Sequence, residues 1–204
     1  MSLCLIAACA VPEAERADVR ATAAVPDTAH PWRKPRDRID SILPMEEYLR
    51  RFRRGLTEPA RLEGGEATRD ALARTFLAAV AHRDTGAFGH LLVSREEFAW
   101  LVFPDHLYSR PPYELDPEVF WMRLSSGNAK GLRRTLQRLG AQQLTFQALD
   151  CRRDTLQITR GPVRIWSSCG IRFRAGDSVV KRRLFGSMVE RDGRVKLMSF
   201  ANDF

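Results

Sequence analysis

The sequence predicts an α+β fold, in which N-terminal helices pack on a C-terminal curved antiparallel sheet of about four strands. Two observations predict it. Apolar residues recur every three or four positions up to residue 139 and every second position from residue 142 onward, which are the periods of an amphipathic helix and a half-buried strand. The 204 residues, 44% of them hydrophobic, suffice for one sizeable core. We therefore expect a single domain over residues 39–204, with its sheet at about 142–204.

The helical half begins after Pro44, where apolar residues at spacings of three and four predict a first helix with an arginine-rich outer face. That face is either solvated or drawn to phosphate-like groups. A second helix is expected at about 67–83, and Ser94 with Glu97 forms a capping box for a short third one. Asp116-Pro117 predicts the start of a further helix. Beyond Gly127 a helical stripe continues until Gly140 stops it.

The strand half contains two turn signals, Gly176-Asp177 and the stronger Asp192-Gly193. Two-residue turns there pair Phe173 with Val180, Cys169 with Leu184, Val189 with Lys196 and Phe185 with Phe200. This register gives a core face of Ile165, Ile171, Phe173, Val180, Leu184, Met188 and Leu197. It also sets Arg172 opposite Lys181, a like-charge pair that costs stability. We expect either an anion between them or a bulge that shifts the register.

The N-terminal segment indicates where the chain works. Residues 10–38 are rich in Ala, Pro, Arg and Asp without a sustained apolar period, which is typical of a flexible tether. Residues 1–9 are apolar and end in Ile6-Ala7-Ala8-Cys9. This ending resembles the lipobox of bacterial lipoproteins, in which small side chains precede the cysteine that carries the lipid. The resemblance implies a signal-peptide remnant at 1–9, lipid attachment at Cys9 and a place in the cell envelope, at the outer membrane or in the periplasm.

That interpretation has a condition. A signal peptide needs a basic n-region and an apolar h-region of about 7 to 15 residues, and Met1 lies too close to Cys9 for either. Translation would therefore have to start upstream of Met1. The alternative is a short apolar N-terminus that merely contains Cys9.

The remaining cysteines favour the same compartment. Cys151 and Cys169 form an even pair, which exported domains use as a disulfide. The alternative is two buried free thiols. Because these cysteines lack the close paired spacing of a zinc site and the four histidines are scattered, we expect no metal and no cofactor.

The order of elements carries a second resemblance. The segment Phe76-Leu77-Ala78-Ala79-Val80 followed by Asp84-Thr85-Gly86-Ala87-Phe88, and the final hairpin of residues 184–197, resemble the nuclear-transport-factor-two-like, or ketosteroid-isomerase-like, superfamily. The resemblance spans about residues 66 to 204. It implies a sheet curved around helices into a cone with an apolar pocket. The superfamily includes enzymes, ligand binders and scaffolding modules, so the fold by itself selects no function.

An enzyme of that kind needs an acid or base facing the pocket. The loop before Trp121 holds candidate catalytic residues, namely Asp105, His106 and Tyr108, with Tyr113 and Asp116 nearby. The alternative is a proline-stiffened loop whose tyrosines pack on the core and whose Asp116 caps a helix. Nucleophile and phosphate-loop motifs are absent.

The charge points to an anionic partner. The net charge is +8, which favours anions without naming one. The predicted outer sheet face combines Trp166, Phe185 and Phe200 with a possible anion-binding set, Arg164, Arg172, Arg174 and Lys181. Such a face suits nucleic acid, but export argues against that partner.

We expect a noncatalytic, envelope-anchored binding or interaction domain that meets the membrane through its lipid and takes an anionic ligand or envelope protein. The alternative is a cone-pocket enzyme, isomerase-like or hydrolase-like, acting on a small apolar or anionic substrate.

Overall fold

The computed structural model describes residues 43–152, 156–159 and 161–204. Within them lie five α-helices and two antiparallel sheets, and the helices precede the strands. The predicted α+β class is therefore confirmed, with seven strands in two sheets where about four in one sheet were expected. The predictions for Cys9 and for the tether at 10–38 fall outside the described residues.

The first helices begin where the sequence supplies caps. Helix α1 (Met45–Phe52) follows Pro44. The Thr68 side chain accepts from Ala71 N at the start of α2 (Arg69–His82). Helix α3 (Thr85–Leu91), which was not predicted, is capped by Asp84, whose side chain accepts from Ala87 N. The predicted capping box of Ser94 and Glu97 is present at α4 (Arg95–Glu97), which continues into a π-helical turn, η2 (Phe98–Val102).

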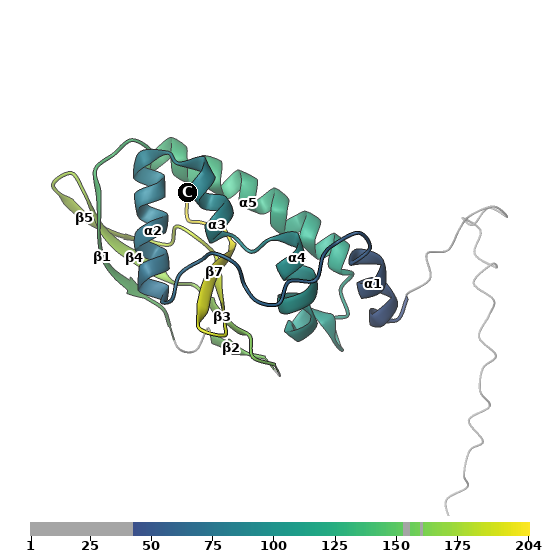
Figure 1. Ribbon diagram of the computed structural model, residues 1–204. Helices are drawn as coiled ribbons and strands as arrows, with labels where there is room; N and C mark the ends of the chain where they lie inside the picture. Colours follow the sequence, from purple (N-terminus) through teal and green to yellow (C-terminus); the bar gives the residue numbers. More distant parts are fainter. Residues whose placement is uncertain (1–42, 153–155, 160) are drawn as a thin grey trace, which may run out of the picture. The chain divides into compact units, whose positions relative to one another are not determined.

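The aromatic and proline-rich loop contains two 3-10 turns, η3 (Phe103–Asp105) and η4 (Leu107–Ser109). Helix α5 (Pro117–Leu139) then starts with Asp116 as its cap and Pro117 in its first turn, as predicted. It continues through Gly127 as one helix, and Gly140 follows its last residue, as predicted. In Figure 1, α2 lies across the strands β1 and β4, while α1 and α4 lie at the other end, beside the start of α5.

The strands form two separate sheets. The three-stranded sheet has the order β1-β4-β5, from β1 (Leu144–Asp150), β4 (Gly170–Ala175) and β5 (Ser178–Arg182). The four-stranded sheet has the order β2-β3-β6-β7, from β2 (Leu156–Ile158), β3 (Arg164–Ser167), β6 (Ser187–Arg191) and β7 (Arg194–Ser199). The chain changes sheet between β1 and β2, between β3 and β4, and between β5 and β6. At the second of these changes Ser168 has a left-handed φ of 56°.

The predicted register holds next to both turns. Phe173 pairs with Val180, Arg172 with Lys181 and Val189 with Lys196. The predicted register extends to Met188 opposite Leu197, and beyond this pair a bulge shifts the pairing so that Ser187 lies opposite Ser199. The expected pairs Phe185 with Phe200 and Cys169 with Leu184 lie outside the ladders, because β6 begins at Ser187 and β5 ends at Arg182.

The core covers both faces of the four-stranded sheet. Successive residues of β6, Met188 and Val189, are fully buried in two different hydrophobic clusters. Phe185 and Phe200, predicted on the outer face, are also buried, and the Phe76 ring of α2 contacts both at centroid distances of 5.5 and 5.8 Å. The half-polar outer face predicted from alternation therefore survives only on the three-stranded sheet.

Candidate anion-binding site

The three-stranded sheet has one covered face and one open face. Phe146, Phe173 and Val180 are aligned across its strands and point toward α2 and the core. On the other face, the alternation of the strands brings out side chains that are all exposed. We call this surface the basic sheet face; its residues are Thr145, Gln147, Arg172, Arg174, Val179 and Lys181.

The anion expected between Arg172 and Lys181 is the carboxylate of Asp150. Its Oδ2 atom lies 2.8 Å from Lys181 Nζ and 3.4 Å from Arg172 Nη2. The hydrogen bond from Lys181, followed by the positive charges of Lys181 and Arg172, lowers the pKa of the Asp150 carboxyl below its usual value. Arg172 and Lys181 can therefore lie opposite each other, because both form an ion pair with the same carboxylate at the end of β1.

The predicted disulfide between Cys151 and Cys169 is present. It joins the residue after β1 to the residue before β4. Beside it is a hollow of about 500 Å³, open to solvent, which we call the disulfide hollow. Its lining residues are Asp150, Cys151, Arg152, Ser168, Gly170, Lys181, Arg182, Arg183 and Asp203.

The structure divides the predicted anion-binding set. Arg172, Arg174 and Lys181 share the basic sheet face, but Arg164 lies on β3 in the other sheet, where its guanidinium is 3.5 Å from Glu190. The sequence did not indicate Asp150, Arg152 or Arg183 as neighbours of this surface. The predicted register also sets Arg182 on the same face as the core residue Ile171, but Arg182 is exposed, because β5 ends there.

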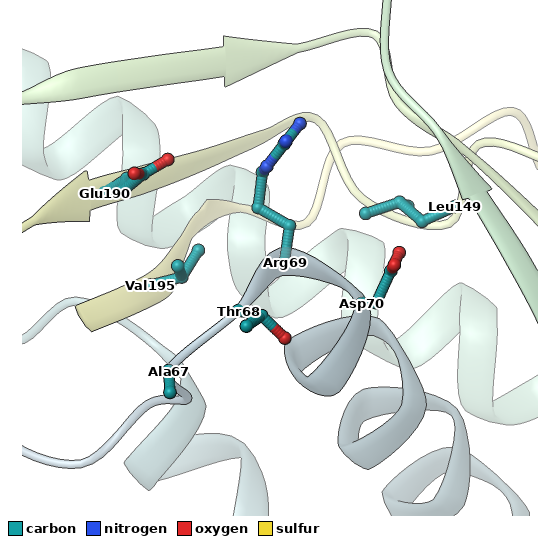
Figure 2. Close-up of a pocket in the computed structure, with 7 residues that line it drawn as sticks. All are labelled: Ala67, Thr68, Arg69, Asp70, Leu149, Glu190 and Val195. Atoms are coloured by element: carbon teal, nitrogen blue, oxygen red, sulfur yellow. The ribbon is translucent and has the colours of Figure 1, made fainter. Parts of the chain in front are cut away.

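A second hollow, of about 320 Å³, lies at the start of α2. Figure 2 shows Arg69 rising from the helix between Glu190 and Leu149, with Thr68 and Asp70 beside it. Three of its polar side chains, those of Thr68, Arg69 and Glu190, already have partners. The Arg69 guanidinium stacks 3.7 Å from the centre of the Trp166 ring, and the indole N–H of Trp166 donates to Glu190 at 2.9 Å. These contacts join α2 to the four-stranded sheet.

A third hollow, of about 720 Å³, has an acidic rim that includes Glu58, Glu63 and Glu96. Glu97 and Lys196, which also line it, form an ion pair in which each side chain is 3% exposed. Lys196 Nζ also donates to the Glu63 carbonyl at 2.6 Å. The charged groups at this position therefore bond to each other and to the backbone.

The candidate catalytic residues lie in and around the two 3-10 turns. His106 is buried, its Nδ1 accepts from Tyr108 N at 3.1 Å, and its ring contacts the rings of Tyr108 and Phe120 at 5.0 and 5.1 Å. Burial, followed by the charge of Arg110, lowers the pKa of His106 to about 4. The Asp105 carboxylate lies against Gly161. Each group thus has a structural partner, and the catalytic assignment stays a prediction.

Three further observations bear on the class of site. Among the described residues, no group of three or more His, Cys, Asp or Glu side chains could hold a metal ion. Within the same part of the chain, no helix combines the length and the apolar character needed to cross a membrane. No protein-family model, no curated protein and no solved structure matches this chain.

Proposed function

We propose that this chain is a noncatalytic binding domain of the cell envelope, whose basic sheet face holds an extended anionic polymer. The observation that carries the proposal is the row formed by Arg174, Arg172 and Lys181 on an open sheet face. Three cations stand there against one carboxylate, that of Asp150. Anionic ligands are attracted to such a surplus.

The geometry of the row favours a chain-like ligand. Arg172 and Lys181 are opposite each other on neighbouring strands, and Arg174 follows two residues along β4. Two residues of a strand span about 6.6 Å. The cations are therefore spaced along a flat surface, where an extended polyanion can meet them in succession.

The surroundings of the row favour a polymer without bases. Recognition of single-stranded nucleic acid commonly uses exposed aromatic rings on which bases stack. Of the three rings expected beside the arginines, Phe185 and Phe200 are buried and Trp166 is covered by Arg69. The remaining large apolar side chain on the face is Val179, which is 49% exposed.

A charge-matched comparison tests this function. The triple variant Arg172→Gln, Arg174→Gln, Lys181→Gln removes the row, and Arg123→Gln, Lys130→Gln, Arg133→Gln removes the same charge from exposed positions of α5. Affinity for heparin, used as a model polyanion, is measured over a range of salt concentrations. We expect the first variant to lose most binding and its salt slope to fall by about 2 to 3, near 0.9 for each lost contact.

The control variant should keep its heparin affinity within about twofold. Salt screens the attraction between the ligand and exposed charges that lie far from it. Equal losses in the two variants would show binding through net charge alone and would reject the site. Single-stranded DNA of matched charge is the second probe. Binding of DNA that equals or exceeds that of heparin would overturn the choice of a polymer without bases.

The envelope anchor is tested separately. When the protein is expressed with its upstream codons, we expect mass spectrometry of the membrane fraction to find a diacylglyceryl group on Cys9. An unmodified N-terminus in that fraction would reject the anchor. The binding measurement above does not depend on this result.

A further inference from the structure

We infer that a hollow beside α1 binds the phosphate headgroup of an anionic phospholipid and docks this end of the domain on a membrane surface. The hollow has a volume of about 360 Å³, within the range of about 300 to 1,000 Å³ for small-ligand sites. In Figure 1, α1 lies at the opposite end of the domain from β4 and β5, so the hollow is separate from the basic sheet face. We call it the arginine–tryptophan hollow; its lining residues are Glu46, Arg50, Arg53, Arg54 and Trp100.

Arg53 is a partly buried cation that is held in one place. Its guanidinium lies 3.9 Å from the centre of the Trp100 ring, and its Nε–H donates to the Ala99 carbonyl at 3.1 Å. Among the described residues no carboxylate forms an ion pair with it, and Glu58 acts on it only from a greater distance. Burial lowers the pKa of the Arg53 guanidinium. Because a partly desolvated charge is stabilised by a counter-ion, an anion that enters the hollow stabilises Arg53.

Two further arginines extend the positive surface. Arg54 is exposed, and within the described part of the chain its side chain forms neither an ion pair nor a hydrogen bond. Arg50 is held by Glu47 through two hydrogen bonds, both at 2.7 Å. Because Glu47 offsets Arg50, the attraction for an anion comes mainly from Arg53 and Arg54. Guanidinium groups donate paired N–H groups to phosphate oxygens, so these two side chains suit a phosphate.

Trp100 favours a lipid headgroup over a soluble anion. Tryptophan is enriched where membranes meet water, because its ring is apolar and its N–H is polar. The Trp100 ring packs against the core cluster that contains Phe52 and Phe98, and its Nε1 atom is buried without an acceptor. A donor in that condition is unfavourable. Because Trp100 lines the hollow, a headgroup oxygen that enters there can become its acceptor.

The place of α1 in the sequence favours the same partner. It is the first described helix after the predicted tether at 10–38 and the predicted lipid attachment at Cys9. In this respect the inference rests on the proposed function, which sets the chain beside a membrane. Arginine side chains near an anionic membrane surface raise the affinity by about fivefold each. A lipid anchor and a basic helix close to it along the chain can thus act together.

Vesicle sedimentation tests the docking without the anchor. The full chain carrying Cys9→Ser, which removes the predicted lipid site, is mixed with vesicles of phosphatidylcholine or of an equimolar phosphatidylcholine–phosphatidylglycerol mixture. We expect binding to the mixed vesicles that weakens with salt, and little binding to the neutral ones. Glycerophosphoglycerol, the same headgroup without acyl chains, should not displace the protein at equal phosphate concentration. Displacement there would identify a free phosphodiester as the ligand and overturn membrane docking.

Charge variants locate the site. Arg53→Gln with Arg54→Gln should weaken vesicle binding about 20-fold, near fivefold for each arginine. Arg54→Gln alone should weaken it about fivefold, and this exposed side chain has no part in the fold. Lys130→Gln with Arg133→Gln removes the same charge from exposed positions of α5 and should change binding less than about twofold. Glu46→Gln should strengthen binding about threefold, a gain that unfolding cannot produce.

A tryptophan variant reports contact with the bilayer. Brominated phosphatidylcholine in the mixed vesicles quenches the fluorescence of tryptophan rings that touch the bilayer. Trp100→Phe keeps an aromatic ring under Arg53 and removes the N–H, so we expect less quenching and about fivefold weaker binding. Trp166→Phe is the matched control, because Arg69 covers that ring, and it should keep the quenching. Unchanged quenching in Trp100→Phe would reject the contact.

The outcomes separate this inference from the proposed function. Wild-type protein that binds heparin but not the mixed vesicles overturns the headgroup site alone. Equal losses in the Arg53, Arg54 variant and the α5 variant, or equal affinity for neutral vesicles, also overturn it. The triple variant of the basic sheet face should lose less vesicle affinity, and more heparin affinity, than the Arg53, Arg54 variant. Failure to bind heparin while vesicle binding persists overturns the proposed polymer ligand and leaves the headgroup site standing.

Discussion

Lys196 of β7 and Glu97 of α4 form an ion pair at 2.8 Å, although the two residues are 99 positions apart and each side chain is only 3% exposed. The Glu97 oxygens also accept from Glu63 N at 2.6 Å and from Ser94 N at 2.7 Å. The pair thus joins a loop, a helix cap and the edge strand β7. Buried charges are tolerated in this way when every donor and acceptor has a partner.

Removing one partner should be more damaging than neutralising both. Lys196→Met leaves the Glu97 carboxylate buried without its cation, and we expect a loss of about 3 to 5 kcal/mol in the free energy of unfolding. Adding Glu97→Gln should restore part of this loss, because the buried charge is gone. Urea unfolding measures both. The exposed Lys130→Met should change stability by less than about 0.5 kcal/mol. A double variant less stable than Lys196→Met would contradict this account.

Helix α5 contains two glycines, Gly131 and Gly127, at which we expect substitution by alanine to have opposite effects on stability. A Cβ atom at Gly131 would collide with the Phe200 carbonyl, whereas a Cβ at Gly127 meets nothing within 4 Å. Gly131→Ala should therefore destabilise the protein by about 2 to 4 kcal/mol, in the range of overpacked or broken core contacts. Gly127→Ala should stabilise it by about 0.5 to 1 kcal/mol, as alanine does within a helix. Thermal unfolding of the two variants checks the pair, and equal shifts would refute it.

The close approach at Gly131 is reinforced by side-chain amides. Asn128 donates to the Met198 carbonyl at 3.1 Å and accepts from Phe200 N at 2.7 Å, which continues the β7 hydrogen bonds onto the helix. Asn202 donates to the Gly131 carbonyl at 2.8 Å. These contacts explain why α5 is continuous through Gly127. Packing against the C-terminal residues outweighs the local preference of glycine to interrupt a helix.

Reduction of the disulfide should lower stability measurably. Cys151 and Cys169 are 18 positions apart, and closing a loop of that size is worth about 3 kcal/mol in the chain-entropy description. We expect the melting temperature to fall on addition of reductant and to fall similarly in Cys151→Ser with Cys169→Ser. The reductant should have no effect on that double variant. If reductant still lowers the melting temperature of the double variant, the effect does not come from the Cys151–Cys169 disulfide.

Local signals in the sequence were reliable predictors of the fold. The Ser94 and Glu97 capping box, the Asp116-Pro117 helix start and the hairpin at Asp192-Gly193 each depend on neighbouring residues, and each is present. At that hairpin both Asp192 and Gly193 have positive φ values, 49° and 72°, as a type I′ turn requires.

The features that were not predicted from the sequence depend on contacts between distant segments or on an unusual backbone conformation. The change of sheet at Ser168 needs a left-handed φ on a non-glycine residue, which carries no composition signal. The burial of Lys196 depends on Glu97, and the sharing of Asp150 depends on a strand 31 residues away. Strand alternation located Arg172, Arg174 and Lys181 correctly on one face, but it could not show that Arg164 belongs to a different sheet.

His106 should make the protein less stable in acid. Its pKa is lowered from 6.5 to about 4, first by burial and then by the charge of Arg110. Between those two values the unfolded chain binds a proton that the folded chain does not, so stability falls as pH decreases through this window. The loss between pH 7.5 and 4.5 should reach about 2 to 3 kcal/mol. His106→Asn keeps an acceptor for Tyr108 N and removes the titration. Urea unfolding at both pH values should therefore show a smaller acid loss in the variant than in the wild type, and equal losses would assign the acid sensitivity to other groups.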